Sequence, residues 1–210
     1  MLAVVSSAKI YRSTGTVVRS PATWQEYQAL CDRRGDGSIP RIKYRSGELF
    51  LMSPLPKHGR DASLIADIIK VLLDHVGQEY DSFTPVTMQL PEESGNALRA
   101  RYAIEPDYCF YIDRWEAVSG KERIDWHNDP PPDLVLEIDV TSYSDVNDYI
   151  PYRVPEVWLF RNKQLSIYQL QGDGYDLRSQ SRYFPEANLP EAIGRCLQIA
   201  YQRNTRASVQ

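Results

Sequence analysis

The clearest pattern of apolar and polar positions runs from residue 133 to residue 140. Leucine, isoleucine and valine at the even positions alternate with side chains at the odd positions that include the carboxylates of Glu137 and Asp139. This period of two predicts a β-strand with one face in the core and the carboxylates on its other face. Because they are two residues apart, the carboxylates point in the same direction, about 7 Å apart along the backbone, which suits a shared cation.

Residues 107–112 show a second alternation, directly after Pro106. Proline cannot donate a hydrogen bond to a strand ladder, so Asp107 is expected near the beginning of this strand or at a sheet edge. If the two alternating strands are neighbours, Asp107 and Glu137 come together. The sequence therefore predicts an acidic pair on adjacent strands.

Apolar residues at helical spacing predict three helices. The most regular pattern covers residues 64–76, where aliphatic side chains fall on one side and charged side chains on the other. Thr23 and Glu26 have the spacing of a capping box, which predicts a short helix over residues 24–31. A last apolar pattern predicts a helix over residues 190–201.

The remaining apolar runs predict further strands and one short helix. Residues 41–45 and 48–52 are expected to pair around a Ser-Gly turn, and the polar stretch before Pro151 is expected to hold a short helix. Strands are also expected over residues 84–90, 156–160, 165–170 and 175–179, with a polar loop at 91–96. The sum is an α+β fold with a mixed central sheet, one long packed helix and an antiparallel C-terminal meander, in a single domain over residues 1–210.

Composition places the chain among ordinary globular proteins. Its 210 residues are 42% hydrophobic and 25% charged, and the formal net charge is −4 at pH 7. This charge gives no global attraction to a polyanion, so nucleic-acid binding would require a local basic patch. Three cysteines without CxxC spacing predict reduced thiols and a cytoplasmic location. We expect no membrane association, because no run approaches the roughly 20 apolar residues of a membrane span and the first residues do not resemble a signal peptide.

Four short blocks, in order along the chain, carry a resemblance to a known family. They are Gly47–Pro54 with the following His58, then Pro106-Asp107, then Pro132–Glu137, and finally Val154–Trp158. In this order they resemble a restriction endonuclease family, catalogued as a domain of unknown function, within the PD-(D/E)XK nuclease superfamily. The resemblance implies a restriction endonuclease-like core over about residues 40–175. An N-terminal arm and helix would occupy residues 1–39, and a C-terminal helix about residues 189–201.

The resemblance also implies a metal-dependent endonuclease that hydrolyses phosphodiester bonds of nucleic acid, with DNA as the expected substrate. Asp107 and Glu137 match the aspartate and glutamate that bind Mg²⁺ or Mn²⁺, Glu48 matches an acidic position before the long helix, and His58 matches a histidine at its start. Phosphodiester hydrolysis needs a hard cation, and carboxylates supply its oxygen ligands. The expected metal ligands are therefore Asp107, Glu137 and Glu48, with His58 and Asp139 as further catalytic candidates. A homodimer is expected only by analogy with superfamily relatives.

The chain departs from the family pattern at three positions. The superfamily usually has a lysine two residues after the glutamate to hold the attacking water, and here that position is Asp139. The family often moves this lysine to the following helix, where the chain has Asp145, and Arg153 replaces a family glycine. An aspartate cannot act as a cationic water-holder. Lys57 or Lys43 would have to reach the site from another element.

Two other classes of function stay open. A catalytically degenerate nuclease fold would bind nucleic acid or a protein without turnover, and it differs from an active nuclease in whether a lysine amine reaches the acids. A regulatory or assembly module would use exposed aromatic side chains such as Tyr168 and Tyr175, and a basic surface patch would argue against it. The sequence contains no serine-hydrolase elbow, P-loop, zinc-protease or dinucleotide-binding signature.

Each candidate residue also has a purely structural interpretation. Asp107 could cap a turn, and Glu48 could be a solvated carboxylate at the start of a strand. His58 could be a polar residue near a helix terminus, and Asp139 could be an ion-paired acid. Tyr149 is expected in packing rather than in chemistry.

Overall fold

The computed structural model describes residues 9–13, 15–45, 47–90, 102–139 and 144–208. The chain divides into two compact units. The N-terminal unit combines Met1–Leu55 with Thr87–Glu105, and the C-terminal unit combines Pro56–Val86 with Pro106–Gln210. The α+β class is confirmed, because each unit contains one sheet and at least one helix. The single domain expected from the sequence stays a prediction.

The N-terminal unit is built on a six-stranded antiparallel sheet with the order β1-β2-β4-β3-β7-β6. Its strands are β1 (Lys9–Ser13), β2 (Thr16–Ser20), β3 (Arg41–Arg45), β4 (Glu48–Met52), β6 (Met88–Leu90) and β7 (Tyr102–Ile104). Helix α1 (Trp24–Arg34) begins at the predicted capping box of Thr23 and Glu26. Its Trp24 and Tyr27 rings pack into the core of this unit.

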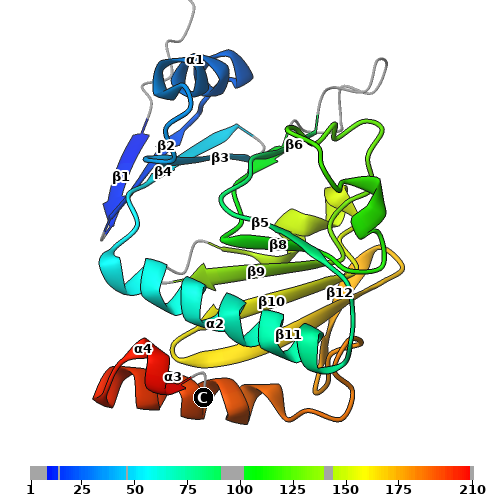
Figure 1. Ribbon diagram of the computed structural model, residues 1–210. Helices are drawn as coiled ribbons and strands as arrows, with labels where there is room; N and C mark the ends of the chain where they lie inside the picture. Colours follow the sequence, from blue (N-terminus) through cyan, green and yellow to red (C-terminus); the bar gives the residue numbers. More distant parts are fainter. Residues whose placement is uncertain (1–8, 14, 46, 91–101, 140–143, 209–210) are drawn as a thin grey trace, which may run out of the picture. The chain divides into compact units, whose positions relative to one another are not determined.

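The C-terminal unit holds a second six-stranded sheet, with the order β12-β11-β10-β9-β8-β5 (Figure 1). Strands β9 and β10 are parallel and the other pairs are antiparallel, so this sheet is mixed, as predicted. Its strands are β5 (Asp81–Phe83), β8 (Tyr108–Tyr111), β9 (Leu134–Asp139), β10 (Glu156–Arg161), β11 (Gln164–Gln171) and β12 (Gly174–Arg178). Its helices are α2 (Pro56–His75), η1 (Trp115–Ala117), η2 (Val146–Tyr152), α3 (Leu189–Gln202) and α4 (Thr205–Ser208). Strands β10, β11 and β12 form the predicted antiparallel meander.

One face of the mixed sheet carries the core of the C-terminal unit. Leu134, Leu136 and Ile138 of β9 pack in one cluster with the aliphatic side chains of α2 and α3. Burial of apolar surface is the main favourable term in folding, so this layer fixes α2 against the sheet. The long packed helix predicted from the sequence is therefore confirmed, and its packing decides where its first residues lie.

Both faces of β9 are buried, whereas the sequence pattern predicted core packing for one face only. On the second face, Val135, Glu137 and Asp139 are at most 9% exposed. A buried carboxylate is costly unless it accepts hydrogen bonds or pairs with a cation. The partners of Glu137 and Asp139 therefore determine how this face is organised.

The strand predicted over residues 84–90 is confirmed only at residues 88–90 and is wrong for residues 84–87. The chain forms β5 before Pro85 and β6 after it, and these two strands pair with β8 and β7 in different sheets. Proline has no N–H to donate to a ladder, so a continuous central strand cannot run through this position. The loop predicted at 91–96 lies outside the described residues, as does Val140.

Other differences between predicted and observed elements lie at helix ends. Helix α2 begins at Pro56, eight residues before the apolar pattern. Proline is well tolerated at the first helical position, and the polar first turn that follows shows no apolar pattern. Helix α1 continues to Arg34 and is capped by Gly35, which has a positive φ of 58°. The short helix before Pro151 is the 3₁₀ helix η2, which includes that proline. In the described ranges, no helix is long and apolar enough to cross a membrane.

Candidate active site

Asp107 and Glu137 lie at neighbouring strands of the C-terminal unit. The paired register ends with Tyr108 of β8 opposite Leu136 of β9, so Asp107 directly precedes β8 and Glu137 is the next residue of β9. The charges of both acids act on the buried Tyr149, which places the two carboxylates near one side chain. Asp107 is 1% exposed and Glu137 is 9% exposed. The structure thus brings together two acids that the sequence placed on adjacent strands.

His58 holds one oxygen of Asp107. Its Nε2 lies 2.7 Å from Asp107 Oδ1, and both side chains are almost completely buried. The other oxygen, Oδ2, accepts a hydrogen bond of 2.7 Å from the backbone N–H of Ile138 in β9. Both oxygens are therefore fixed, one by the first turn of α2 and one by the neighbouring strand.

Two hydroxyl groups hold the carboxylate of Glu137. Ser144 Oγ donates to Oε1 at 2.6 Å, and Tyr149 OH donates to Oε2 at 2.9 Å. Burial raises the pKa of Tyr149 well above its usual value, and the negative charges of Glu137 and Asp107 raise it further. The phenol therefore stays protonated and acts as a hydrogen-bond donor. Tyr149, expected only in packing, is thus a direct partner of a site carboxylate.

Asp139 is paired with a cation from the adjacent strand. Arg161 of β10 lies opposite Asp139 in the parallel register, and its Nε and Nη2 atoms are 2.8 Å and 2.5 Å from Asp139 Oδ2. The same guanidinium donates to the backbone carbonyl of Ser144. The ion-paired interpretation of Asp139 therefore describes the structure, and Arg161 connects Asp139 to the residue that holds Glu137.

Three other positions considered as sources of a cation have structural partners. Asp145, where the family often has a lysine, is the N-cap of η2, and its Oδ1 accepts from the backbone N–H of Asn147 at 3.0 Å. The Lys57 ammonium lies 6.0 Å from the ring of Tyr201 in α3. In the N-terminal unit, the Lys43 ammonium lies 5.5 Å from the ring of Phe50. The role of either lysine in holding water stays a prediction.

Glu48 belongs to the N-terminal unit, where it is the first residue of β4. Its side chain is 41% exposed, and its Oε2 lies 3.6 Å from Arg45 Nη2 in the adjoining strand. This contact fits the interpretation of Glu48 as a solvated carboxylate at a strand start. Its proposed role as a metal ligand stays a prediction.

The acidic pair fits a divalent ion that takes few ligands from the protein. Within the described residues, no three His, Cys, Asp or Glu side chains gather in a group that could hold a metal. Magnesium keeps several waters and commonly binds through one or two carboxylates together with substrate phosphates. Asp107 and Glu137 supply oxygen ligands of this kind, and their hydrogen bonds to His58, Ser144 and Tyr149 fix the orientation that ligating carboxylates usually require.

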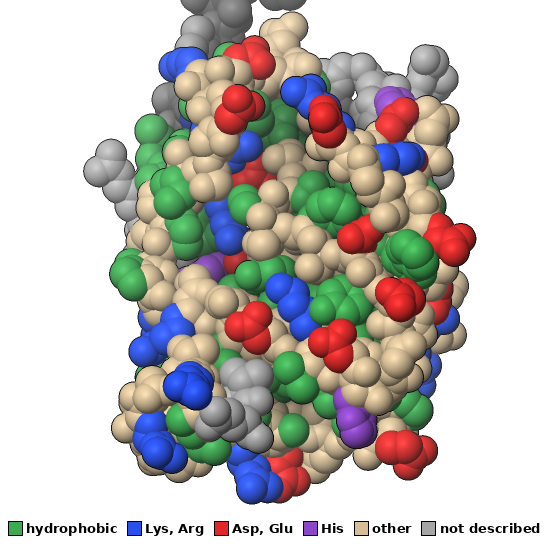
Figure 2. Space-filling view, viewed as in Figure 1, with side chains coloured by type: hydrophobic (Ala, Val, Ile, Leu, Met, Phe, Trp, Pro, Cys, Tyr) green, Lys and Arg blue, Asp and Glu red, His purple; other side chains and the backbone are tan. Residues whose placement is uncertain are grey.

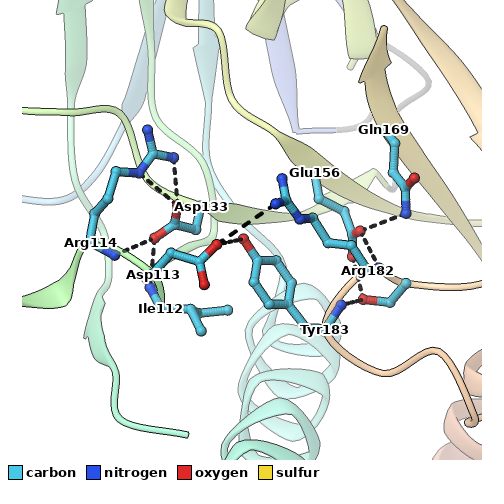
Figure 3. A network of polar contacts seen from close by, with 9 residues as sticks. Ile112, Asp113, Arg114, Asp133, Glu156, Gln169, Arg182 and Tyr183 are labelled. Atoms are coloured by element: carbon cyan, nitrogen blue, oxygen red, sulfur yellow. Dashed lines mark hydrogen bonds and ion pairs between the residues drawn. The ribbon is translucent and has the colours of Figure 1, made fainter.

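Other acids in the motif blocks are structural (Figure 3). Asp133 accepts from the backbone N–H of Ile112 at 2.8 Å and from Arg114 Nε at 2.7 Å. Glu156 is fully buried and accepts from the Trp158 indole at 2.7 Å. It also accepts from Gln169, Ser181 and the Arg182 backbone. The Pro132-Asp133 and Pro155-Glu156 steps therefore connect the starts of the central strands β9 and β10 to neighbouring strands and loops, whereas Asp107 and Glu137 form the candidate site.

Sequence reasoning missed Ser144 and Arg161. Neither residue belongs to a motif block, and Ser144 follows a segment whose pattern gives no direction for its side chain. Arg161 could have been found only through the parallel register of β9 and β10, which pairs it with Asp139. The thiol of Cys109, on β8, is unsuited to nucleophilic chemistry, because burial and the charge of Glu137 raise its pKa far above the usual value.

Comparison with known proteins identifies the relatives of this chain. A family model described as "Uma2: Putative restriction endonuclease" matches residues 24–201. One similar solved structure is that of "a putative nuclease belonging to DUF820" from Anabaena variabilis, at 15% sequence identity and a TM-score of 0.44. The alignment covers 72% of this chain and 84% of that one. No curated protein matches the chain.

Proposed function

Because the chain belongs to the Uma2 family of restriction endonuclease-like proteins, we propose that it hydrolyses phosphodiester bonds of DNA with a divalent metal ion. Asp107 and Glu137 would hold Mg²⁺ or Mn²⁺, with Glu48 as a further proposed ligand. One observation carries this proposal: two buried carboxylates, one directly before β8 and one in the paired strand β9, are each oriented by their own hydrogen-bond partners.

The residues of the chain prepare this site for a charged substrate. When bound, the metal ion neutralises charge on the phosphate and lowers the pKa of water. His58 and the Ile138 backbone keep both Asp107 oxygens in place, while Ser144 and Tyr149 keep Glu137 in place. Because these carboxylates are already oriented, they lose little conformational freedom when a metal ion binds, which favours its binding.

The test is cleavage of supercoiled plasmid in Mg²⁺ or Mn²⁺ by the native chain and by Asp107→Asn and Glu137→Gln. Both variants keep side-chain volume and remove one negative charge each, so we expect loss of cleavage with a retained fold. The matched control is Asp173→Asn, because Asp173 is a fully exposed loop carboxylate in the same unit. Cleavage that survives in both site variants would rule out the catalytic assignment.

A second candidate function is DNA binding without turnover. The observation that favours it is the absence of a lysine at both expected positions. Position 139, where the superfamily usually has a lysine, is an aspartate paired with Arg161, and Asp145 is a helix cap. In this case the native chain would bind DNA and Mn²⁺ but would not nick plasmid under any metal condition. Calorimetric titration of Mn²⁺ beside the cleavage assay separates the two functions.

A further inference from the structure

We propose that Lys57, Arg60 and Lys163 bind the phosphodiester backbone of duplex DNA; these three residues are called the cationic rim. The inference rests on the proposed function, which supplies DNA as the ligand. It adds a surface on the C-terminal unit that would hold the substrate beside the candidate site. The argument rests on a cavity, on the charges around it and on the contacts of those charges.

Two residues of the cationic rim line a cavity of about 470 Å³ between the start of α2, the turn after β10, and α3, and Arg60 lies on the ring of Tyr201, which also lines it. Lys57 and Lys163 both line the cavity, with Phe160 and Leu197 on its apolar wall. The two lysines come from elements far apart in the sequence, and the fold brings them to one opening. Two ammonium groups at one opening favour an anionic ligand.

Arg60 and Lys57 are anchored on an aromatic ring. The Arg60 guanidinium carbon lies 4.0 Å from the centre of the Tyr201 ring, and the Lys57 ammonium lies 6.0 Å from it. Cation–π contact restrains the side chains while their N–H groups remain able to donate. Arginine in this arrangement suits a phosphate, because its planar N–H groups match the phosphate oxygens.

One acid lies in the cavity wall, and its contacts limit its effect. Asp61 is 3% exposed, and its Oδ1 accepts a hydrogen bond of 2.6 Å from Tyr201 OH. Its charge reduces the positive potential of the opening, but the same hydrogen bond holds the ring against which Arg60 and Lys57 lie. In the described part of the chain, no carboxylate oxygen lies within 4.0 Å of a side-chain nitrogen of the cationic rim.

Positive charge gathers on one part of an acidic protein. Several other cations of the C-terminal unit are ion-paired, for example Lys121 with Asp129 and Arg178 with Asp176. Figure 2 shows Lys and Arg side chains gathered at the lower left, where Figure 1 places the start of α2 and the end of α3 with α4. The first turn of α2 carries no acidic residue, so the positive end of its dipole adds to the potential of this surface.

The rim lies next to the candidate site along the chain. Lys57 and His58 are consecutive in the first turn of α2, and His58 holds Asp107. A DNA backbone that contacts Lys57 would therefore meet the helical turn that also carries His58, the residue that orients a proposed metal ligand. Phosphate contacts of this kind position a nucleic acid without reading its sequence.

The test measures fluorescence anisotropy of a labelled 20-base-pair duplex in EDTA, across a series of salt concentrations. The rim variant combines Lys57→Ala, Arg60→Ala and Lys163→Ala. The control combines Lys121→Ala, Arg123→Ala and Arg178→Ala, which removes the same charge from exposed positions elsewhere in the unit. We expect the rim variant to bind about tenfold or more weakly and to lose about one unit of salt slope for each contact, while the control stays within about twofold of the native chain.

Equal affinities of the rim and control variants would overturn the proposal, and so would a native chain that does not bind the duplex. Binding of the native chain to phosphatidylserine vesicles in place of DNA would also overturn it. If the triple variant does not fold by circular dichroism, Lys57→Glu alone gives the same test, because an acid is favourable in a first helical turn. Binding in EDTA is measured without the metal ion that cleavage requires, so a failure of hydrolysis and a failure of DNA binding are distinguishable.

Discussion

At the scale of single residues, the candidate site is defined more by hydrogen-bond partners than by the acids themselves. Asp107 and Glu137 could be predicted from the alternation and from the resemblance. Their partners Ser144 and Arg161 could not, because a partner depends on strand register and on the path of a turn. A hydrophobic pattern shows which face a residue occupies and contains no information on which side chain reaches it.

Replacing His58 with glutamine tests whether the orientation of Asp107 matters for function. The imidazole is the side chain that holds Oδ1, so we expect Mn²⁺ affinity and plasmid cleavage to fall by about 10- to 100-fold. Calorimetry of Mn²⁺ binding and the rate of nicking measure the effect. His75→Gln, at the far end of the same helix, is the control. Unchanged Mn²⁺ affinity in His58→Gln would contradict the positioning role.

Replacing Arg161 with alanine tests the ion pair at position 139. The Asp139 side chain is fully buried and would lose its guanidinium partner, so we expect a loss of about 3 kcal/mol in the free energy of unfolding. Asp139→Asn with Arg161→Gln should recover part of this loss, since it removes both charges. Urea unfolding of the single and double variants measures the coupling, and additive effects would show that the two residues do not interact.

At the scale of elements, period and capping predicted most helices and strands, and a proline caused the main error. The alternation over residues 84–90 continues through Pro85, but backbone hydrogen bonding cannot. The polar first turn of α2 was missed because it carries no apolar pattern. That turn includes Lys57 and His58, and Arg60 directly follows it, so the pattern was least informative where the helix contributes to the proposed function.

The capping box of α1 predicts a pH-dependent contribution to stability. The pKa of Glu26 is lowered from its usual value of 4.5, chiefly by the hydrogen bond from the Thr23 backbone N–H. A lowered pKa in the folded state contributes stability above pH 4.5, and this contribution is lost as the pH falls through the folded-state value. We expect Thr23→Ala to lower the free energy of unfolding by about 1 kcal/mol. We expect Glu26→Gln to remove the contribution of Glu26 to the pH dependence of that free energy. Urea unfolding between pH 3 and 7, at about one-unit steps, checks both results.

At the scale of the whole molecule, one apolar layer determines where the site residues of the C-terminal unit lie. Leu136 is fully buried at the centre of the cluster that joins β9 to α2 and α3. The same strand carries Glu137 on its other face, and the same helix carries His58. Family membership could be predicted from the order of the motif blocks, but the division of the chain into two compact units could not. The first boundary, after Leu55, falls between the Gly47–Pro54 block and His58, where the sequence carries no boundary signal.

Leu136→Ala tests how strongly this layer stabilises the C-terminal unit. Removing the side chain leaves a cavity among α2, α3 and the sheet, so we expect a loss of about 3 kcal/mol in the free energy of unfolding. Chemical denaturation followed by tryptophan fluorescence reports the change, since Trp158 belongs to the same cluster. Leu177→Ala, at a 65% exposed position of β12, is the control and should change stability by less than about 0.5 kcal/mol.

The ion pair between Asp139 and Arg161 also constrains how this chain could change. A lysine placed at position 139 by a single substitution would put a second cation directly against a guanidinium that already spans to Ser144. The ammonium and the guanidinium would repel each other at a buried position, so this substitution would lower the stability of the fold. A variant with the lysine usual in the superfamily at position 139 would therefore also need a replacement for Arg161 on the neighbouring strand.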